Sequence, residues 1–262
     1  MIANPLNPGL RHEQMAVLAA LIALIVASWV YLWLGAGIEM DKMDMGGGAI
    51  MAMTPAWTTG YAALVLIMWV VMMTVMMLPG AAPAILRIAG LAHEQGSKAG
   101  GVGSALLFGG GYLMVWTGFS VAATLLQWAL DSAGLLSETM ASASPVAARL
   151  LIIAVGLYQL TPLMQACLRH CRSCADCPPA NAPEGAGGML VRGLRYGVSC
   201  LGCCGVLMVL LFVGGVMNVF WMAAIAIGVL AEKLLPRGDG VARLAGAGLI
   251  AWGSIALAFA VL

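Results

Sequence analysis

Two groups of sulfur-bearing residues lie in apolar parts of this chain. The first belongs to a methionine-rich run, and its members are Met72, Met76 and Met77. The second combines cysteines with a methionine, and its members are Cys200, Cys203, Cys204 and Met208. Thioethers and thiolates are the soft ligands that suit Cu(I), and thiolates also suit zinc. We therefore expect the chain to handle a soft metal, Cu(I) first and Zn(II) as the alternative, or to carry out thiol redox chemistry.

The spacing within each group supports a shared site. Cysteines 200, 203 and 204 stand at i, i+3 and i+4, so a helix presents all three on one face, with Met208 one turn further. A single buried cysteine behaves as a small hydrophobe, but three within five residues favour a site. The methionines form a helical stripe that core packing also explains. The C-x-x-C spacing from Cys200 to Cys203 keeps a redox role open.

The composition is that of a membrane protein built from helices. Hydrophobic residues make up 62% of the 262 residues and charged residues only 9%, with a mean hydropathy of +0.99. Soluble domains carry about 25% charged residues. We predict one integral membrane domain over residues 1–262, an all-α bundle whose natural partner is the lipid bilayer. No basic run indicates nucleic acid.

Seven stretches are apolar enough to be spans of about 20 residues. They are 15–35, 59–78, 104–127, 147–166, 196–216, 219–234 and 243–261, with six spans as the alternative. Basic residues favour the cytoplasmic side. An N-terminus in the cytoplasm places all 12 basic residues inside except Lys42 and Arg149, as in a multi-pass protein of the bacterial inner membrane.

This topology brings the two sulfur groups to one depth. The span 59–78 reaches the cytoplasmic side near its methionines, and the span 196–216 leaves that side near its cysteines. At about 1.5 Å per residue, both groups lie within roughly two turns of the inner surface. We therefore expect these two helices to be in contact, with methionine and cysteine sulfurs close together.

Two loops carry further candidate ligands. An outer loop over 36–56 offers three thioethers for metal capture, from Met40, Met43 and Met45, unless it simply rests on the membrane. An inner loop over 167–195 contains a second candidate metal site. Its members are Cys167, His170, Cys171, Cys174 and Cys177. Cysteines two to four residues apart are common in zinc sites, so a docking point, a local zinc clip and unliganded thiols all remain open.

Polar residues at the ends of the spans have structural explanations. Tyr158 and its neighbours Gln159 and Thr161 are expected to support either the metal site or a kink at Pro162 by hydrogen bonding. Asn218 is expected to satisfy the backbone ends of two helices. Glu232 and Lys233 are expected to snorkel to the inner surface as a pair.

From Tyr61 to its C-terminus the chain resembles the DUF2182 family, the predicted metal-binding integral membrane proteins of bacteria. The resemblance rests on stretches around Trp69 to Pro79, Tyr158 to Pro162, Cys167 with Cys171-Arg172, Cys200 to Met208, Gly215 to Met222, and Glu232-Lys233. It implies a metal site in the membrane. Cys174, Cys177 and the methionine-rich outer loop are additions to the family pattern, and the resemblance implies no role for them.

These observations favour metal handling: acquisition of Cu(I), its transfer, or the loading of a partner metalloprotein. The main alternatives are a membrane thiol-disulfide electron carrier and a structural or assembly subunit of a larger membrane complex. The absence of a phosphate-binding G-x-x-x-x-G-K-[ST] loop argues against ATP-driven pumping. We name no catalytic residues, because neither a general base nor an open carboxylate site is found, and an enzyme that uses the metal for redox chemistry stays open as an alternative.

Overall fold

The computed structural model describes residues 8–34, 41–44, 50–53, 57–94, 100–136, 144–173 and 186–261. Its elements, in chain order, are α1 (Pro8–Trp33), β1 (Asp41–Asp44), β2 (Ile50–Met53), α2 (Thr59–Glu94), α3 (Gly100–Ser132), α4 (Pro145–Gln159), α5 (Pro162–Ser173), α6 (Ala186–Val209), α7 (Leu211–Gly214), α8 (Val219–Leu234) and α9 (Gly238–Val261).

Helices build the body of the molecule, as the composition predicts. Five segments of the described chain are long and apolar enough to cross a membrane: His12–Trp33, Thr59–His93, Gly100–Ser132, Gly187–Gly214 and Gly238–Phe259. The pair α4 and α5 is bent by 62° at its break and makes a sixth if counted as one span. Helix α8 has only 16 residues. The predicted count of seven spans is therefore not confirmed.

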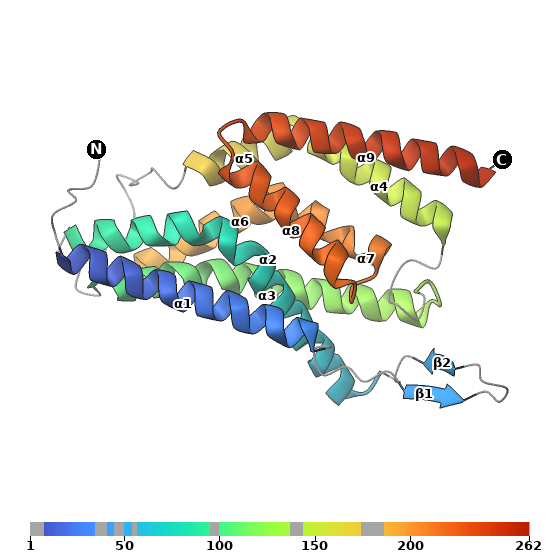
Figure 1. The fold of residues 1–262 in the computed structure, drawn as a ribbon, viewed down its shortest axis with the longest axis horizontal. Coiled ribbons are helices and arrows are strands. Elements are labelled where there is room, and N and C mark those ends of the chain that lie inside the picture. The colour runs from blue at the N-terminus through green and yellow to red at the C-terminus, as the bar shows by residue number, and fades with distance from the viewer. Residues whose placement is uncertain are drawn as a thin grey trace.

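The helices form two groups joined by α8 (Figure 1). Helix α3 packs along both α2 and α6, and α1 covers α2. Helices α4 and α9 lie side by side, and α8 contacts α2, α5, α6 and α9. In the most apolar stretch of each segment, 56% of the residues are buried for α2 and α6, but only 17% for α1 and α9. The two helices that carry the sulfur groups are thus interior, and α1 and α9 are peripheral.

Helix α2 continues past Pro79, where the sequence predicted its end. Prolines 79 and 83 both lie inside it, and its ribbon changes direction in this region (Figure 1). A proline in a helix removes one backbone donor, which bends the helix without ending it when neighbouring groups satisfy the freed carbonyls. Nearby, the Tyr112 hydroxyl of α3 donates to the carbonyl of Met77 at 3.1 Å.

The turn between α7 and α8 confirms one sequence-based prediction. The side chain of Asn218 accepts a hydrogen bond from the Trp221 backbone at 3.1 Å and donates to the Gly214 carbonyl at 3.2 Å. It therefore satisfies the end of α7 and the beginning of α8 together. Gly215, with φ of +90°, supplies the backbone conformation that this reversal requires.

The two predicted loops are partly regular structure. Strands β1 and β2 form an antiparallel hairpin within residues 36–56, in which Met43 pairs with Met51. Met40 and Met45 lie outside the described residues. The segment 167–195 is helical up to Ser173 in α5 and again from Ala186 in α6. Cys174 and Cys177 fall between these helices, outside the described residues.

Candidate metal centre

Four cysteine sulfurs from two helices converge in the interior. On α6, Cys203 lies with its Sγ 3.2 Å from that of Cys204, and Cys200 is one turn earlier. From α5, Cys171 brings its Sγ to 3.9 Å from that of Cys203. All four side chains are at most 3% exposed. We call these residues, Cys171, Cys200, Cys203 and Cys204, the cysteine side of the cluster.

Cys200 has polar neighbours from two other helices. The Nζ of Lys233 on α8 donates to its sulfur at 2.8 Å, and the Tyr112 hydroxyl of α3 lies 3.2 Å away. Gly80 of α2 leaves room for the lysine chain, since a Cβ there would lie 2.8 Å from Lys233 Cδ. Helices α3 and α8 therefore contact this one sulfur of α6, and α2 packs against the lysine that reaches it.

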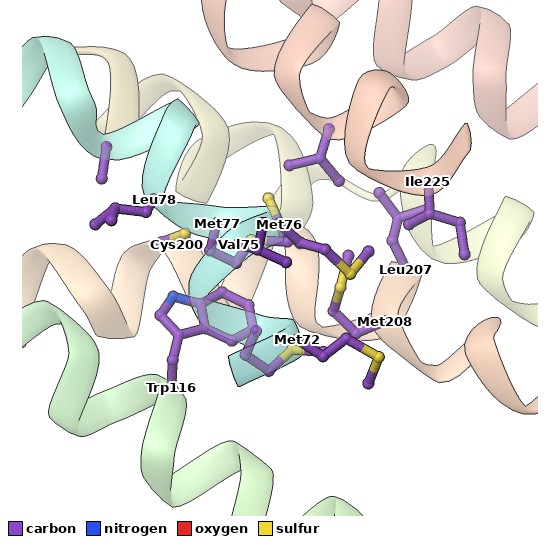
Figure 2. Close-up of a cluster of buried hydrophobic side chains, with 14 of the residues drawn as sticks. Met72, Val75, Met76, Met77, Leu78, Trp116, Cys200, Leu207, Met208 and Ile225 are labelled. Carbon is purple, nitrogen blue, oxygen red and sulfur yellow. The ribbon is translucent and has the colours of Figure 1, made fainter. Parts of the chain in front are cut away.

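Four methionines complete the cluster, namely Met72, Met76, Met77 and Met208, and we call them the methionine side. All are at most 2% exposed and belong to the same buried core as the cysteines. Figure 2 shows them with Cys200 among apolar neighbours such as Val75, Leu78, Trp116, Leu207 and Ile225. The predicted direct contact between α2 and α6 is not confirmed, because α3 packs along both helices. Tyr112 of α3 links them by contacting the Met77 carbonyl and the Cys200 sulfur.

The described members of the second predicted site, Cys167, His170 and Cys171, do not share one face of α5. Cys171 joins the cysteine side, and the Cys167 sulfur packs instead against Gly202 of α6, where a Cβ would lie 2.8 Å from it. His170 is exposed on the other face of α5. Residues four apart share a helix face and residues one apart do not, which explains why His170 points away from its cysteine neighbours.

Hydrogen bonds at the α4–α5 break hold α5 against α6. Thr161 accepts from the Met164 backbone at 3.3 Å and donates to the Tyr158 carbonyl at 2.7 Å. The Tyr158 hydroxyl donates to the carbonyl of Gly202, next to Cys203. These residues therefore support both the bend before Pro162 and the approach of Cys171 to α6.

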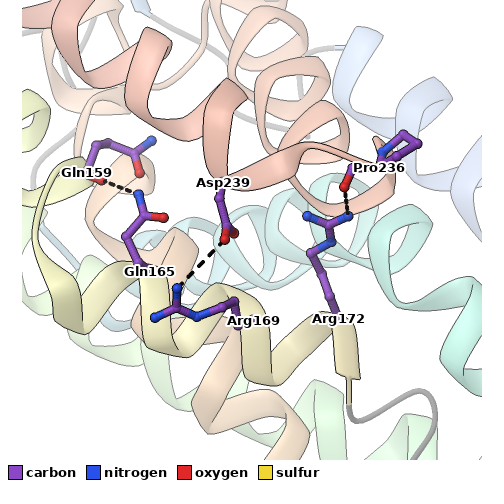
Figure 3. A network of polar contacts seen from close by, with 6 residues as sticks. All are labelled: Gln159, Gln165, Arg169, Arg172, Pro236 and Asp239. Carbon is purple, nitrogen blue, oxygen red and sulfur yellow. Dashed lines mark hydrogen bonds and ion pairs between the residues drawn. The ribbon is translucent and has the colours of Figure 1, made fainter.

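Glu232 and Lys233 do not snorkel, so this prediction was wrong. They are 1% and 7% exposed, respectively. The last turn of α8 lies between α2, α4 and α5, so both side chains end inside the protein. Gln159 donates to Glu232 Oε1 at 2.8 Å. Figure 3 shows Gln159 beside Gln165, which donates to its backbone carbonyl, and Arg172, which donates to the Pro236 carbonyl just after α8.

The donor set fits a soft metal in type. No group of three or more His, Cys, Asp or Glu side chains within the described ranges is already arranged around a metal position. Metal–sulfur bonds of about 2.3 Å place two sulfurs of a tetrahedral site ~3.8 Å apart. The 3.9 Å between Cys171 and Cys203 matches that spacing, and the 3.2 Å between Cys203 and Cys204 would have to widen.

Sequence reasoning missed Tyr112 and the inward orientation of Lys233. The sequence contains a feature that indicates each of them. Tyr112 follows Gly109, Gly110 and Gly111, and such small residues allow helices to approach closely. A Cβ at Gly111 would overlap the Leu190 carbonyl of α6, so this contact sets the distance from Tyr112 to Cys200. A lysine and a glutamate in an apolar helix are expected to face the bundle interior.

The comparisons identify the family. A family model described as PpoB2, copper chaperone, matches residues 66–256, which cover both sides of the cluster and both buried charges. The name differs from the DUF2182 resemblance drawn from the motifs, but this family too is concerned with a metal. No curated protein and no solved structure matches the chain. By this match the chain belongs to the PpoB2 copper chaperone family, and its role is related to copper.

Proposed function

We propose that this protein is a membrane-embedded chaperone that binds Cu(I) in the buried sulfur cluster and passes it to a partner metalloprotein. The observation that carries the proposal is the convergence of four buried cysteine sulfurs beside four buried methionines, within the stretch that matches the copper chaperone family. In this proposal copper is the cargo, which the protein binds and then transfers.

The ligand types support transfer. Thiolates hold Cu(I) more firmly than neutral thioethers do, and both are soft ligands. A cluster with cysteines at one side and methionines at the other can hold the ion and still release it by stepwise ligand exchange. Met72, Met76, Met77 and Met208 are the exchangeable ligands in this proposal. Cys200, Cys203 and Cys204, joined by Cys171, are the firm ones.

The proposed membrane topology has seven passes, an extracytoplasmic C-terminus and a cytoplasmic N-terminus in the bacterial inner membrane. Helix α8 runs opposite to α6 and α9 in Figure 1, which supports counting it as a pass despite its 16 residues. Charge asymmetry supports the orientation. The Cys171-bearing end of α5 and the beginning of α6 then lie towards the cytoplasm, and Cys200, Cys203 and Cys204 lie deeper, in the second half of α6.

Copper acquisition at the outer methionines Met40, Met43 and Met45 and zinc binding by Cys167, His170, Cys171, Cys174 and Cys177 remain secondary proposals. For zinc, the exposed position of His170 and the separate packing of Cys167 argue against one compact site in the described residues. A docking role for Cys174 and Cys177 would let a partner metalloprotein collect the ion on the cytoplasmic side.

Metal analysis of the purified full-length protein tests the proposal. We expect the reduced protein in detergent to bind Cu(I) in competition with a chromogenic Cu(I) chelator. Replacing Cys200, Cys203 and Cys204 with serine should abolish binding, while Cys167→Ser, a cysteine outside the cluster, should retain it. An absence of copper binding together with a reversible two-electron thiol couple would overturn the proposal in favour of an electron carrier.

A further inference from the structure

A buried positive charge stands directly against the cysteine side. The Lys233 ammonium is 2.8 Å from Cys200 Sγ, and its side chain is 7% exposed. Burying an ammonium costs several kcal/mol unless an anion compensates it. Among the described residues, the Cys200 sulfur accepts the hydrogen bond of the Lys233 ammonium. An anionic sulfur centre is therefore what this position of the lysine favours.

The neighbouring glutamate does not cancel this charge. Glu232 is directed towards α4, where its Oε1 accepts from Gln159. Its second oxygen and the side-chain oxygens of Gln159 and Gln165 are all buried, and none has a hydrogen-bond partner in the described part of the chain. A buried carboxylate oxygen without a donor is costly, and a proton on Glu232 removes that cost. Glu232 is then neutral, and the charge of Lys233 is left for the sulfur cluster.

The charge of the metal centre connects Lys233 to the cargo. With the same number of thiolate ligands, a Cu(I) centre carries one more negative charge than a Zn(II) centre. The buried ammonium therefore stabilises the Cu(I) centre more than the Zn(II) centre. Since the proposed function assumes that Cu(I) is the cargo, the following inference rests on it.

We propose that Lys233 is the counter-cation of a cuprous thiolate centre that includes Cys200, and that it thereby favours monovalent over divalent soft metals at this site. Lys233 binds no metal itself. It acts through Cys200, with Gly80 giving it space and Tyr112 holding the other side of the sulfur. The preference is the property to measure, because a purely structural role would weaken the binding of all metals alike.

The test compares Cu(I), Ag(I) and Zn(II) affinities of the full-length protein and its Lys233→Gln variant by competition titration. Glutamine keeps an unbranched, hydrogen-bonding side chain without the charge and adds no sulfur ligand. We expect the two monovalent ions to bind about 10–100-fold more weakly, the usual cost of losing a group that supports a metal ligand. Zinc affinity should fall by less than the affinities for the two monovalent ions. An equal loss for all three ions would overturn the inference.

Two further variants keep the test decisive if Lys233→Gln is poorly folded. Lys233→Arg retains the charge and should retain the preference for monovalent ions, whereas a shift towards zinc would contradict the inference. Glu232→Gln reproduces a neutral carboxyl and should also leave the preference unchanged. A shift in this variant would mean that Glu232 is charged and that the charge count fails. Wild-type protein that binds no Cu(I) would instead overturn the proposed function itself.

Discussion

The cysteine side and the methionine side of the cluster are equally buried but differ in what surrounds them. Around the cysteines, the ammonium of Lys233 and the hydroxyl of Tyr112 contact a sulfur directly. Around the methionines, the neighbours are aliphatic and aromatic groups such as Leu78, Leu207 and Trp116. A thiolate needs polar compensation in an apolar interior, whereas a neutral thioether needs only space. The surroundings therefore match a charged ligand set on one side and an uncharged one on the other.

This difference suggests that the cysteine side binds the Cu(I) ion firmly and that the methionine side transfers it. An ion on the cysteine side is retained by charge as well as by ligand bonds, and an ion on the methionine side by weak bonds alone. If the cluster works in this way, changes on the cysteine side should mainly alter affinity, and changes on the methionine side should mainly alter the rate of transfer. The predictions below test this division.

The largest effect is expected from Cys203→Ser. Its sulfur lies between those of Cys204 and Cys171, at 3.2 and 3.9 Å, so this substitution removes the central member of the set. Cu(I) affinity should fall by more than the ~10–100-fold that follows from losing a supporting group. Competition titration against a Cu(I) chelator measures it, with Cys167→Ser as the matched control on α5. Equal losses in the two variants would remove the special status of the cysteine side.

The helical bundle was predictable because segments this long, this apolar and this poor in charged residues are expected to cross a membrane as helices. The position of α2 shows where such reasoning ends. The sequence placed a helix boundary at Pro79, but the helix continues to Glu94 with Pro79 and Pro83 both inside it. Likewise, at the 62° break between α4 and α5 the local hydrogen bond of Thr161 is joined by a tertiary one from Tyr158 to the Gly202 carbonyl of α6. Neither result follows from hydropathy alone.

The candidate site was predictable in its residue types and only partly in its membership. Helical spacing alone groups Cys200, Cys203 and Cys204. Cys171 joins them because the α4–α5 bend turns one face of α5 towards α6, a contact that no local pattern encodes. Lys233 was misplaced for a related reason: its depth depends on which helices cover the end of α8, and the sequence offers only the general rule that charges in apolar helices face inward.

An intermediate effect is expected when Met72, Met76 and Met77 are all changed to leucine. Leucine fills a similar volume, so each change should cost less than about 1.5 kcal/mol of stability. Cu(I) affinity should fall by only about tenfold, equivalent to ~1.4 kcal/mol, because the thiolates remain. Transfer of Cu(I) to a soluble chelator, followed by stopped-flow absorbance, should slow more than affinity changes. A loss of affinity as large as that of Cys203→Ser would place the methionines among the firm ligands.

The smallest effect is expected at the boundary between the two sides, where the Tyr112 hydroxyl contacts both the Met77 carbonyl and the Cys200 sulfur. Tyr112→Phe keeps the ring and removes these contacts, which should cost about 1 kcal/mol. For a chain of this size that corresponds to a fall in Tm of roughly 2–4 °C. Tyr196→Phe is the control, because its ring lies against Tyr112 at 5.6 Å between centroids, at the same depth of burial. Copper affinity should change by less than about fivefold, since Lys233 still supports Cys200. A larger loss of affinity at Tyr112 than at Lys233 would mean that the hydroxyl, and not the ammonium, is the main support of the cysteine side.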